Sequence, residues 1–314
     1  MITLYPQPVF PPVTVINTPA FARRNIKDAT IQMTPQQVRL EAARILSGGL
    51  SLRVWRILDL LAAGGVLSAR RLPALTERKM REWCQMRLFE RISLSAAELK
   101  HHLNDLGLGE ARPTLYMLGP VGAEIATTRH GITPPNGYQG YTPMRIMHDI
   151  AANEIVLQLA DNIGGKGWSV DWFGKYESTL LDKNERTILE PDALIRYRRD
   201  GKDGGDGALL LEYHNEDWST RAAGKVEKYE KAFSEGNWRE RWEVETFPPV
   251  LVVFQKPIVG AGYQKATQGN KKLNCAYFGK TLQSFLDGNL EEWVHINSGK
   301  REMILPARTA EVQI

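Results

Sequence analysis

Two short apolar runs, each carrying a carboxylate, constrain this chain more than any other feature. Residues 189–195 read Leu-Glu-Pro-Asp-Ala-Leu-Ile and carry Asp192, and residues 209–214 read Leu-Leu-Leu-Glu-Tyr-His and carry Glu212. Both runs predict strands, because short apolar stretches bounded by turn residues are typical of strands in a buried sheet. Consecutive strands usually lie side by side. We therefore expect the two carboxylates to meet at one edge of a sheet.

Length and composition allow two compact domains. The 314 residues are 43% hydrophobic and 24% charged, which is an ordinary globular mixture. A net charge of +4 permits nucleic-acid binding without requiring it. The two cysteines, Cys84 and Cys275, form no C-x-x-C pair, so neither a disulfide framework nor a structural zinc site is expected. The chain has no secretory pattern and no run apolar enough to span a membrane, so the expected location is the cytoplasm.

The first part of the chain predicts a winged helix-turn-helix domain over residues 34–130. Prolines make residues 1–33 an expected extended N-terminal arm. Beyond it, Thr34, Ser51 and Thr76 each precede a helical pattern as expected N-caps. Residues 114–118 predict a strand, and a helix is expected to start near Pro120. The Pro- and Gly-rich residues 131–141 predict a linker.

Basic residues gather around the second and third helices of this predicted domain. In a winged helix-turn-helix these helices approach double-stranded DNA, and the third lies in the major groove. The alternative is a solvated basic face on a small helical bundle. The expected DNA-binding residues are Arg70, Arg71, Arg78, Lys79, Arg81 and Arg87.

Residues 142–314 predict a second domain with a mixed sheet, so the fold class is α/β (α+β). Glycine and aspartate in residues 199–207 predict a turn between two strands. The expected helices span residues 148–161, 221–234 and 281–286. The expected strands span residues 168–173, 188–196, 208–213, 249–255 and, as a last edge strand, 292–296.

Carboxylates at strand ends suit the hydrolysis of a phosphodiester. Magnesium prefers oxygen ligands, and a bound ion can activate water and neutralise the phosphate. Asp192 and Glu212 fit that role, with Glu177 as a third ligand. The alternative is that Asp192 caps a turn and Glu212 is solvated. A nucleotide-binding glycine loop, a nucleophile elbow and iron–sulfur spacing are all missing from the sequence.

The order of these motifs resembles the PD-(D/E)XK restriction-endonuclease-like superfamily. More narrowly, it resembles the replication-relaxation family of plasmid and mobile-element proteins, over roughly residues 50–255. The resemblance rests on the predicted winged helix, the helix starting at His148, Pro191-Asp192-Ala193, Leu211-Glu212 and the helix with Lys225 and Tyr229. It implies DNA binding and a relaxase-like role in nicking plasmid DNA for replication or mobilisation, in which Mg²⁺ or Mn²⁺ is held by Glu177, Asp192 and Glu212. A homodimer is left open.

One position departs from the family pattern, because His214 stands where such nucleases carry lysine. We expect either His214 or Lys225, which could reach back from the next helix, to stabilise the phosphate. Tyr229 is expected to pack that helix against the sheet. Two hypotheses therefore remain: a metal-dependent nicking endonuclease, in which Asp192, Glu212, His214 and Lys225 are catalytic, and a non-catalytic DNA-binding replication or transcription regulator with a degenerate nuclease fold.

Overall fold

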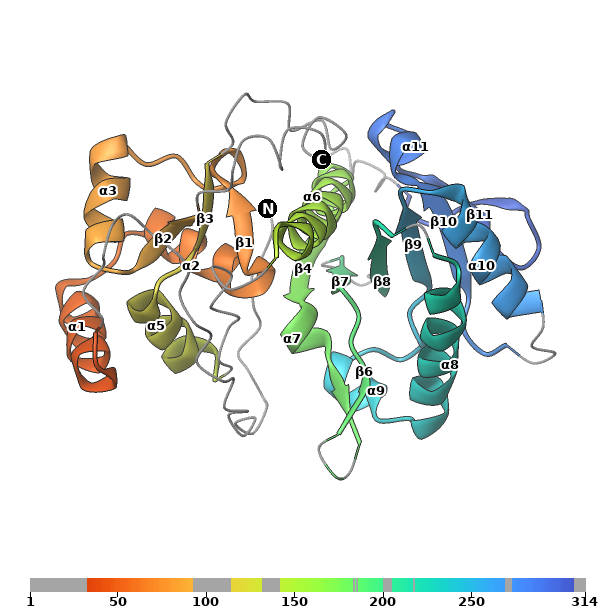
Figure 1. The fold of residues 1–314 in the computed structure, drawn as a ribbon, viewed down its shortest axis with the longest axis horizontal. Helices are drawn as coiled ribbons and strands as arrows, with labels where there is room; N and C mark the ends of the chain where they lie inside the picture. Colours follow the sequence, from red (N-terminus) through yellow and green to blue (C-terminus); the bar gives the residue numbers. More distant parts are fainter. Residues whose placement is uncertain are drawn as a thin grey trace, which may run out of the picture. The chain divides into compact units, whose positions relative to one another are not determined.

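The computed structural model describes residues 33–92, 114–131, 142–182, 184, 186–199, 205–216, 218–268 and 273–307 (Figure 1). The chain divides into two compact units, Leu4–Ile150 and Ala151–Ile314, and the division falls inside helix α6 (Pro143–Gly165). Nearly all of the predicted arm and the predicted linker lies outside the described residues, so both stay predictions. In the described ranges, no helix is long and apolar enough to cross a membrane.

The first unit combines helices with a small antiparallel sheet. Its strands pair in the order β1-β3-β2. The three predicted N-caps are confirmed, since the hydroxyls of Thr34, Ser51 and Thr76 each accept a hydrogen bond from a backbone N–H of the first turn. The elements are α1 (Pro35–Gly48), α2 (Leu52–Gly64), β1 (Val66–Ser68), η1 (Ala69–Arg71), α3 (Glu77–Gln85), β2 (Phe89–Ile92), β3 (Leu115–Leu118) and α5 (Pro120–His130).

The turn between α3 and β2 packs directly against the start of α5. Arg87 in this turn has a φ of 58°, in the left-handed region. A Cβ atom on Gly119 would lie 2.1 Å from the Arg87 carbonyl oxygen, and one on Gly122 would lie 2.1 Å from the Leu88 carbonyl oxygen. Only glycine permits such an approach. The two glycines therefore determine how closely α5 lies against this turn.

A buried carboxylate joins α2 to α5. Asp59 on α2 is 5% exposed. Its Oδ1 lies 2.9 Å from Nε2 of His130 and accepts a hydrogen bond of 3.1 Å from Nε of Arg129. The Arg129 guanidinium also lies 4.6 Å from the centre of the Trp55 ring. Because a buried charge needs partners, this group holds the two helices in one register.

The second unit is built on one mixed sheet. Among the described residues it has seven strands in the order β12-β11-β10-β9-β8-β7-β4. Strands β8, β9 and β10 run parallel, and the flanking pairs are antiparallel. The strands are β4 (Ser169–Gly174), β7 (Ala193–Arg198), β8 (Asp206–His214), β9 (Val250–Phe254), β10 (Tyr277–Thr281), β11 (Glu292–His295) and β12 (Arg301–Met303). The prediction that residues 292–296 form the edge strand is wrong, because β12 pairs outside β11.

Helices and a short ribbon complete this unit. The predicted helix 148–161 is part of the longer α6, and the predicted helix 221–234 is α8. The remaining elements are α7 (Lys175–Ser178), β5 (Leu180–Leu181), β6 (Thr187–Leu189), α8 (Thr220–Glu235), α9 (Trp238–Trp242), α10 (Pro257–Gln268) and α11 (Leu282–Leu286).

One face of the sheet is covered by α8 and α10, which lie side by side (Figure 1). Leu210 of β8 and Val252 of β9 belong to the same buried cluster as Val226 of α8 and Tyr263 of α10. Side chains two residues apart in a strand share a face. Glu212, two residues beyond Leu210, therefore points into this layer beneath α8.

Each unit contains one free thiol. Cys84 lies on α3 and is half-buried, whereas Cys275 is buried in the apolar cluster of the second unit. Burial raises the pKa of Cys84 to about 11. Burial also raises the pKa of Cys275, and the charge of Glu230 adds to that effect.

Candidate functional site

Pro191 splits the predicted strand 188–196 into β6 and β7 and places Asp192 at the break. Proline has no N–H to give to a sheet ladder, so the pairing stops there. The Asp192 backbone N–H donates to the Leu211 carbonyl at 3.0 Å, and Oδ2 of Asp192 accepts from the Tyr213 N–H at 2.8 Å. The Asp192 side chain is thereby fixed beside β8, at Tyr213, the residue that follows Glu212.

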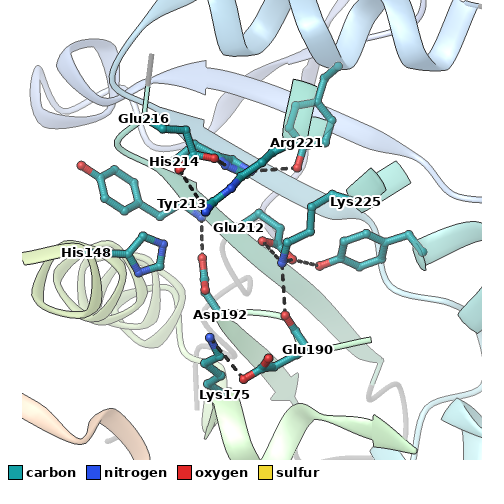
Figure 2. Close-up of polar contacts among 12 residues, drawn as sticks. His148, Lys175, Glu190, Asp192, Glu212, Tyr213, His214, Glu216, Arg221 and Lys225 are labelled. Carbon is teal, nitrogen blue, oxygen red and sulfur yellow. Dashed lines mark hydrogen bonds and ion pairs between the residues drawn. The ribbon is translucent and has the colours of Figure 1, made fainter. Parts of the chain in front are cut away.

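Glu212 is held by two residues of α8 (Figure 2). Its Oε1 accepts hydrogen bonds of 2.7 Å from both Nζ of Lys225 and the hydroxyl of Tyr229, and its Oε2 lies 2.6 Å from Lys225 Nζ. The Glu212 side chain is only 1% exposed. Lys225 and Tyr229 are four residues apart, so both project from the same face of the helix. We call Glu212, Lys225 and Tyr229 the buried triad.

Lys225 connects the buried triad to the loop before β7. Its Nζ donates to the Glu190 carbonyl at 3.2 Å. Burial acts to lower the pKa of Lys225, but the negative charges of Glu212 and Asp192 outweigh it and raise the pKa above its ordinary value. Lys225 is therefore a fixed positive charge that both predicted catalytic carboxylates face. Lys225 thus reaches back from α8 to Glu212, and its role in stabilising a phosphate stays a prediction.

Tyr229 has more than the packing role that its sequence position predicts. It is fully buried in the apolar cluster, as expected, and its hydroxyl also donates to Glu212. Burial and the charge of Glu212 raise its pKa far above the ordinary value. The phenol thus stays protonated and acts as a donor.

His214 is enclosed at the end of β8. It is 3% exposed. Its Nε2 lies 2.8 Å from the Tyr263 hydroxyl of α10, and its Nδ1 lies 3.0 Å from Oε1 of Glu216. Glu216 also accepts from Arg221 at 3.3 Å. With both ring nitrogens engaged inside the protein, His214 in this arrangement links β8 to α10.

Glu177, the third predicted metal ligand, caps a helix. Its Oε2 accepts a hydrogen bond of 2.9 Å from the Gly174 N–H at the start of α7. In the described ranges, no three His, Cys, Asp or Glu side chains lie close enough together to hold a metal ion. Both oxygens of Glu212 are also engaged by the buried triad. The predicted metal site at Glu177, Asp192 and Glu212 therefore stays a prediction.

The predicted DNA-binding residues lie on the first unit, and most of them are exposed. On α3, Arg78 and Lys79 pair with Glu82 at 3.6 and 2.8 Å, and Arg81 pairs with Glu77 at 3.1 Å. Ion pairs at such exposed positions are weak, because water screens both charges. Arg70 and Arg71 lie in η1. The sixth residue, Arg87, has a side chain only 15% exposed that pairs with Glu90.

Two site residues could not be expected from the sequence. Tyr263 lies 49 positions after His214, on a helix in which glycines interrupt the regular spacing of apolar residues. Glu216 follows His214 by two residues in an irregular loop. By contrast, the four-residue spacing of Lys225 and Tyr229 was a signal that both side chains share a helix face.

Comparison with known protein families gives one match. Residues 58–246, more than half of the chain, match the family described as replication-relaxation. The matched range includes α3 of the first unit together with Asp192, Glu212 and Lys225 of the second. No curated protein and no solved structure matches the chain.

Proposed function

Because the chain belongs to the replication-relaxation family, we propose that it binds double-stranded DNA through its first unit. The family suggests a role in the replication or mobilisation of plasmids or other mobile elements. In this proposal the DNA-binding unit is a winged helix-turn-helix, and the second unit is a restriction-endonuclease-like domain whose central carboxylate is held in an ion pair.

One observation carries the proposal of DNA binding. In the described ranges 52–92 and 114–118, the first unit has the order helix, strand, short helix, helix, strand, strand, and its sheet order is β1-β3-β2. This is the order of a winged helix-turn-helix, in which α3 would be the helix that enters the major groove. The cations Arg78, Lys79 and Arg81 lie on that helix, where they would meet phosphates.

The salt dependence of duplex binding tests this proposal. A variant with Arg78, Lys79 and Arg81 changed to glutamine should bind more weakly than the unmodified protein at low salt. The slope of log K against log salt should fall by about 0.9 for each lost phosphate contact. A control with Lys231, Arg239 and Arg301 changed to glutamine removes the same charge from exposed positions of the second unit. An α3 variant with the affinity and slope of the control would refute DNA contact by α3.

The second candidate function is metal-dependent nicking of DNA. It is favoured by the convergence of Asp192 and Glu212 on the charge of Lys225. Against it stands the engagement of Glu212 within the buried triad. A non-catalytic role, in replication control or assembly on DNA, is the form of the proposal that this geometry favours.

A supercoiled-plasmid assay separates the two forms. The protein is incubated with plasmid in Mg²⁺, in Mn²⁺ or in chelator, beside Asp192→Asn and the control Glu227→Gln, which changes an exposed carboxylate of α8. Open circles that need metal and that Asp192→Asn abolishes, with Glu227→Gln still active, would establish the nicking enzyme. Plasmid that stays supercoiled in either metal, although the protein binds duplex DNA, would leave the non-catalytic role.

A further inference from the structure

The ammonium group of Lys225 is held by three oxygen atoms of the second unit. Its Nζ donates to Oε1 of Glu212 at 2.7 Å and to the Glu190 carbonyl at 3.2 Å, and it lies 2.6 Å from Oε2 of Glu212 (Figure 2). A lysine ammonium has three donors and no acceptor, so these three oxygens account for all of its donors. Lys225 is therefore bound as a small cation would be, by a carboxylate and a backbone carbonyl.

The same kinds of oxygen atom bind divalent metal ions. Carboxylate and backbone carbonyl oxygens are the protein ligands that Mg²⁺ and Mn²⁺ prefer. Asp192 and Glu212 are two of the carboxylates at which the sequence predicts such an ion, and the negative charges of both act on Lys225. The ammonium thus lies where the carboxylates predicted to bind a metal ion direct their charge.

Lys225 and a metal ion exclude each other at Glu212. A carboxylate has about four lone-pair sites, two on each oxygen. At Oε1 of Glu212 one of them is taken by Lys225 and the other by the Tyr229 hydroxyl, each at 2.7 Å. A metal ion beside the ammonium would also be repelled by its positive charge at short range. A divalent ion can therefore bind both oxygens of Glu212 only after Lys225 has left them.

The charges around Lys225 show what its removal would leave. The nearby carboxylate of Glu190 pairs with Lys175 at 3.2 Å. Removing Lys225 would take away the cation that Glu212 and Asp192 both face, and the two negative charges of these residues match one divalent ion. The Lys225 side chain is 25% exposed, so an ion from solution can reach its position.

We propose that the Lys225 ammonium takes the place of a divalent metal ion in the second unit. The positive charge that a bound ion would bring to Glu212 and Asp192 is then supplied by the chain itself. With its three donors engaged, Lys225 in this arrangement has no donor left for a DNA phosphate. The identity of this cation goes beyond the proposed duplex binding and does not depend on it, because all three oxygens belong to the second unit.

Binding of Mn²⁺ to variants of Lys225 tests the proposal. The ion is added without DNA, and its binding is measured by electron paramagnetic resonance of free Mn²⁺ and by the shift of the urea midpoint with ion concentration. Lys225→Met should bind Mn²⁺ about 10- to 1000-fold more tightly than the unmodified protein, in which the arrangement without the Lys225–Glu212 pair makes up about 0.1–10% of molecules. Glu212→Gln combined with Lys225→Met should lose this gain.

Three further variants control for charge, for position and for stability. Lys225→Arg keeps a cation at the site, and Lys231→Met removes one from the exposed pair with Glu235 on the same helix. Both should bind Mn²⁺ as weakly as the unmodified protein. Lys225→Gln guards against poor folding of Lys225→Met, because its amide can still donate to Glu212, and it should show the same gain in Mn²⁺ affinity.

Three results would overturn the proposal. The first is an Mn²⁺ affinity of the Lys225→Met and Lys225→Gln variants equal to that of the unmodified protein. The second is a gain in affinity that persists when Glu212→Gln is added. The third is failure of both variants to fold at any Mn²⁺ concentration, because an ion that replaced the ammonium would restore the balance of charge. Failure of the first unit to bind duplex DNA, measured separately, would refute the proposed function and leave this proposal unaffected.

Discussion

Removing the charge of Lys225 should destabilise the second unit strongly. Lys225→Met keeps the length and apolar stem of the side chain but deletes the cation that lies 2.6–2.7 Å from both oxygens of Glu212. The carboxylate that remains is 1% exposed and keeps the Tyr229 hydroxyl as its partner. A buried charge without an opposite charge raises the free energy of the folded state, because water cannot solvate it.

The expected loss can be estimated from the burial of Glu212. Deleting one partner of a buried ion pair typically costs about 3–5 kcal/mol in the free energy of unfolding. Domains are stable by only about 5–15 kcal/mol in total. Lys225→Met should therefore lower the urea midpoint of the second unit by at least about 1 M, since the slope of unfolding free energy on urea is ~1–3 kcal/mol/M.

A double variant separates the charge effect from lost packing. Glu212→Gln with Lys225→Met removes both charges and should recover most of the stability, because a neutral amide can still accept from Tyr229. The matched control is Lys231→Met on the same helix, whose pair with Glu235 is exposed and worth at most about 1 kcal/mol. The reasoning would be refuted if Lys225→Met were no more destabilising than this control, or if the double variant were as unstable as the single one.

The pH dependence of the same pair has a definite sign. The pKa of Lys225 is raised in the folded state, so the folded protein holds this proton more tightly than the unfolded chain does. Its contribution is fully present below the unfolded pKa of about 10.4 and is lost as pH rises through the raised folded value. The difference in stability between the unmodified protein and Lys225→Met should be constant near neutral pH and shrink only in that alkaline range.

Two other predictions concern separate parts of the fold. Gly119→Ala should destabilise the first unit by about 1–3 kcal/mol, because the new Cβ would lie 2.1 Å from the Arg87 carbonyl oxygen. The control is Gly48→Ala, whose Cβ would have no atom within 4 Å. Thermal unfolding compares the two variants, and equal losses of stability would contradict the close packing at Gly119. Burial lowers the pKa of Lys280 to about 8, so between about pH 8 and 10 the unfolded chain binds more protons and stability attributable to Lys280 rises with pH. Urea midpoints of Lys280→Met should lack that rise; a variant that follows the unmodified protein would contradict it.

Most helices and strands could be predicted from signals in neighbouring residues. The contacts of the site could not, because they join residues that are far apart in the sequence. The caps at Thr34, Ser51 and Thr76 were predictable because the hydroxyl and the N–H that it accepts from are three residues apart. Residues 188–196 were predicted as one strand, so the break at Pro191 was not predicted, although the missing N–H of proline is a local signal for it. The enclosure of His214 by Tyr263 depends on how α10 lies against the sheet, which no local pattern specifies.

The position of the two thiols makes the unfolding of each unit measurable without any engineered label. Only the thiolate reacts quickly with alkylating reagents, and burial disfavours that form at both Cys84 and Cys275. Each unit has one of them, so modification of either residue would record the opening of its own unit. Peptide mass analysis of the two sites during a denaturant series would then give two separate unfolding curves from a single sample. The two thiols therefore report the unfolding of the two units separately. The loss of stability expected for Lys225→Met should lower the denaturant midpoint for modification of Cys275 and leave the midpoint for Cys84 unchanged.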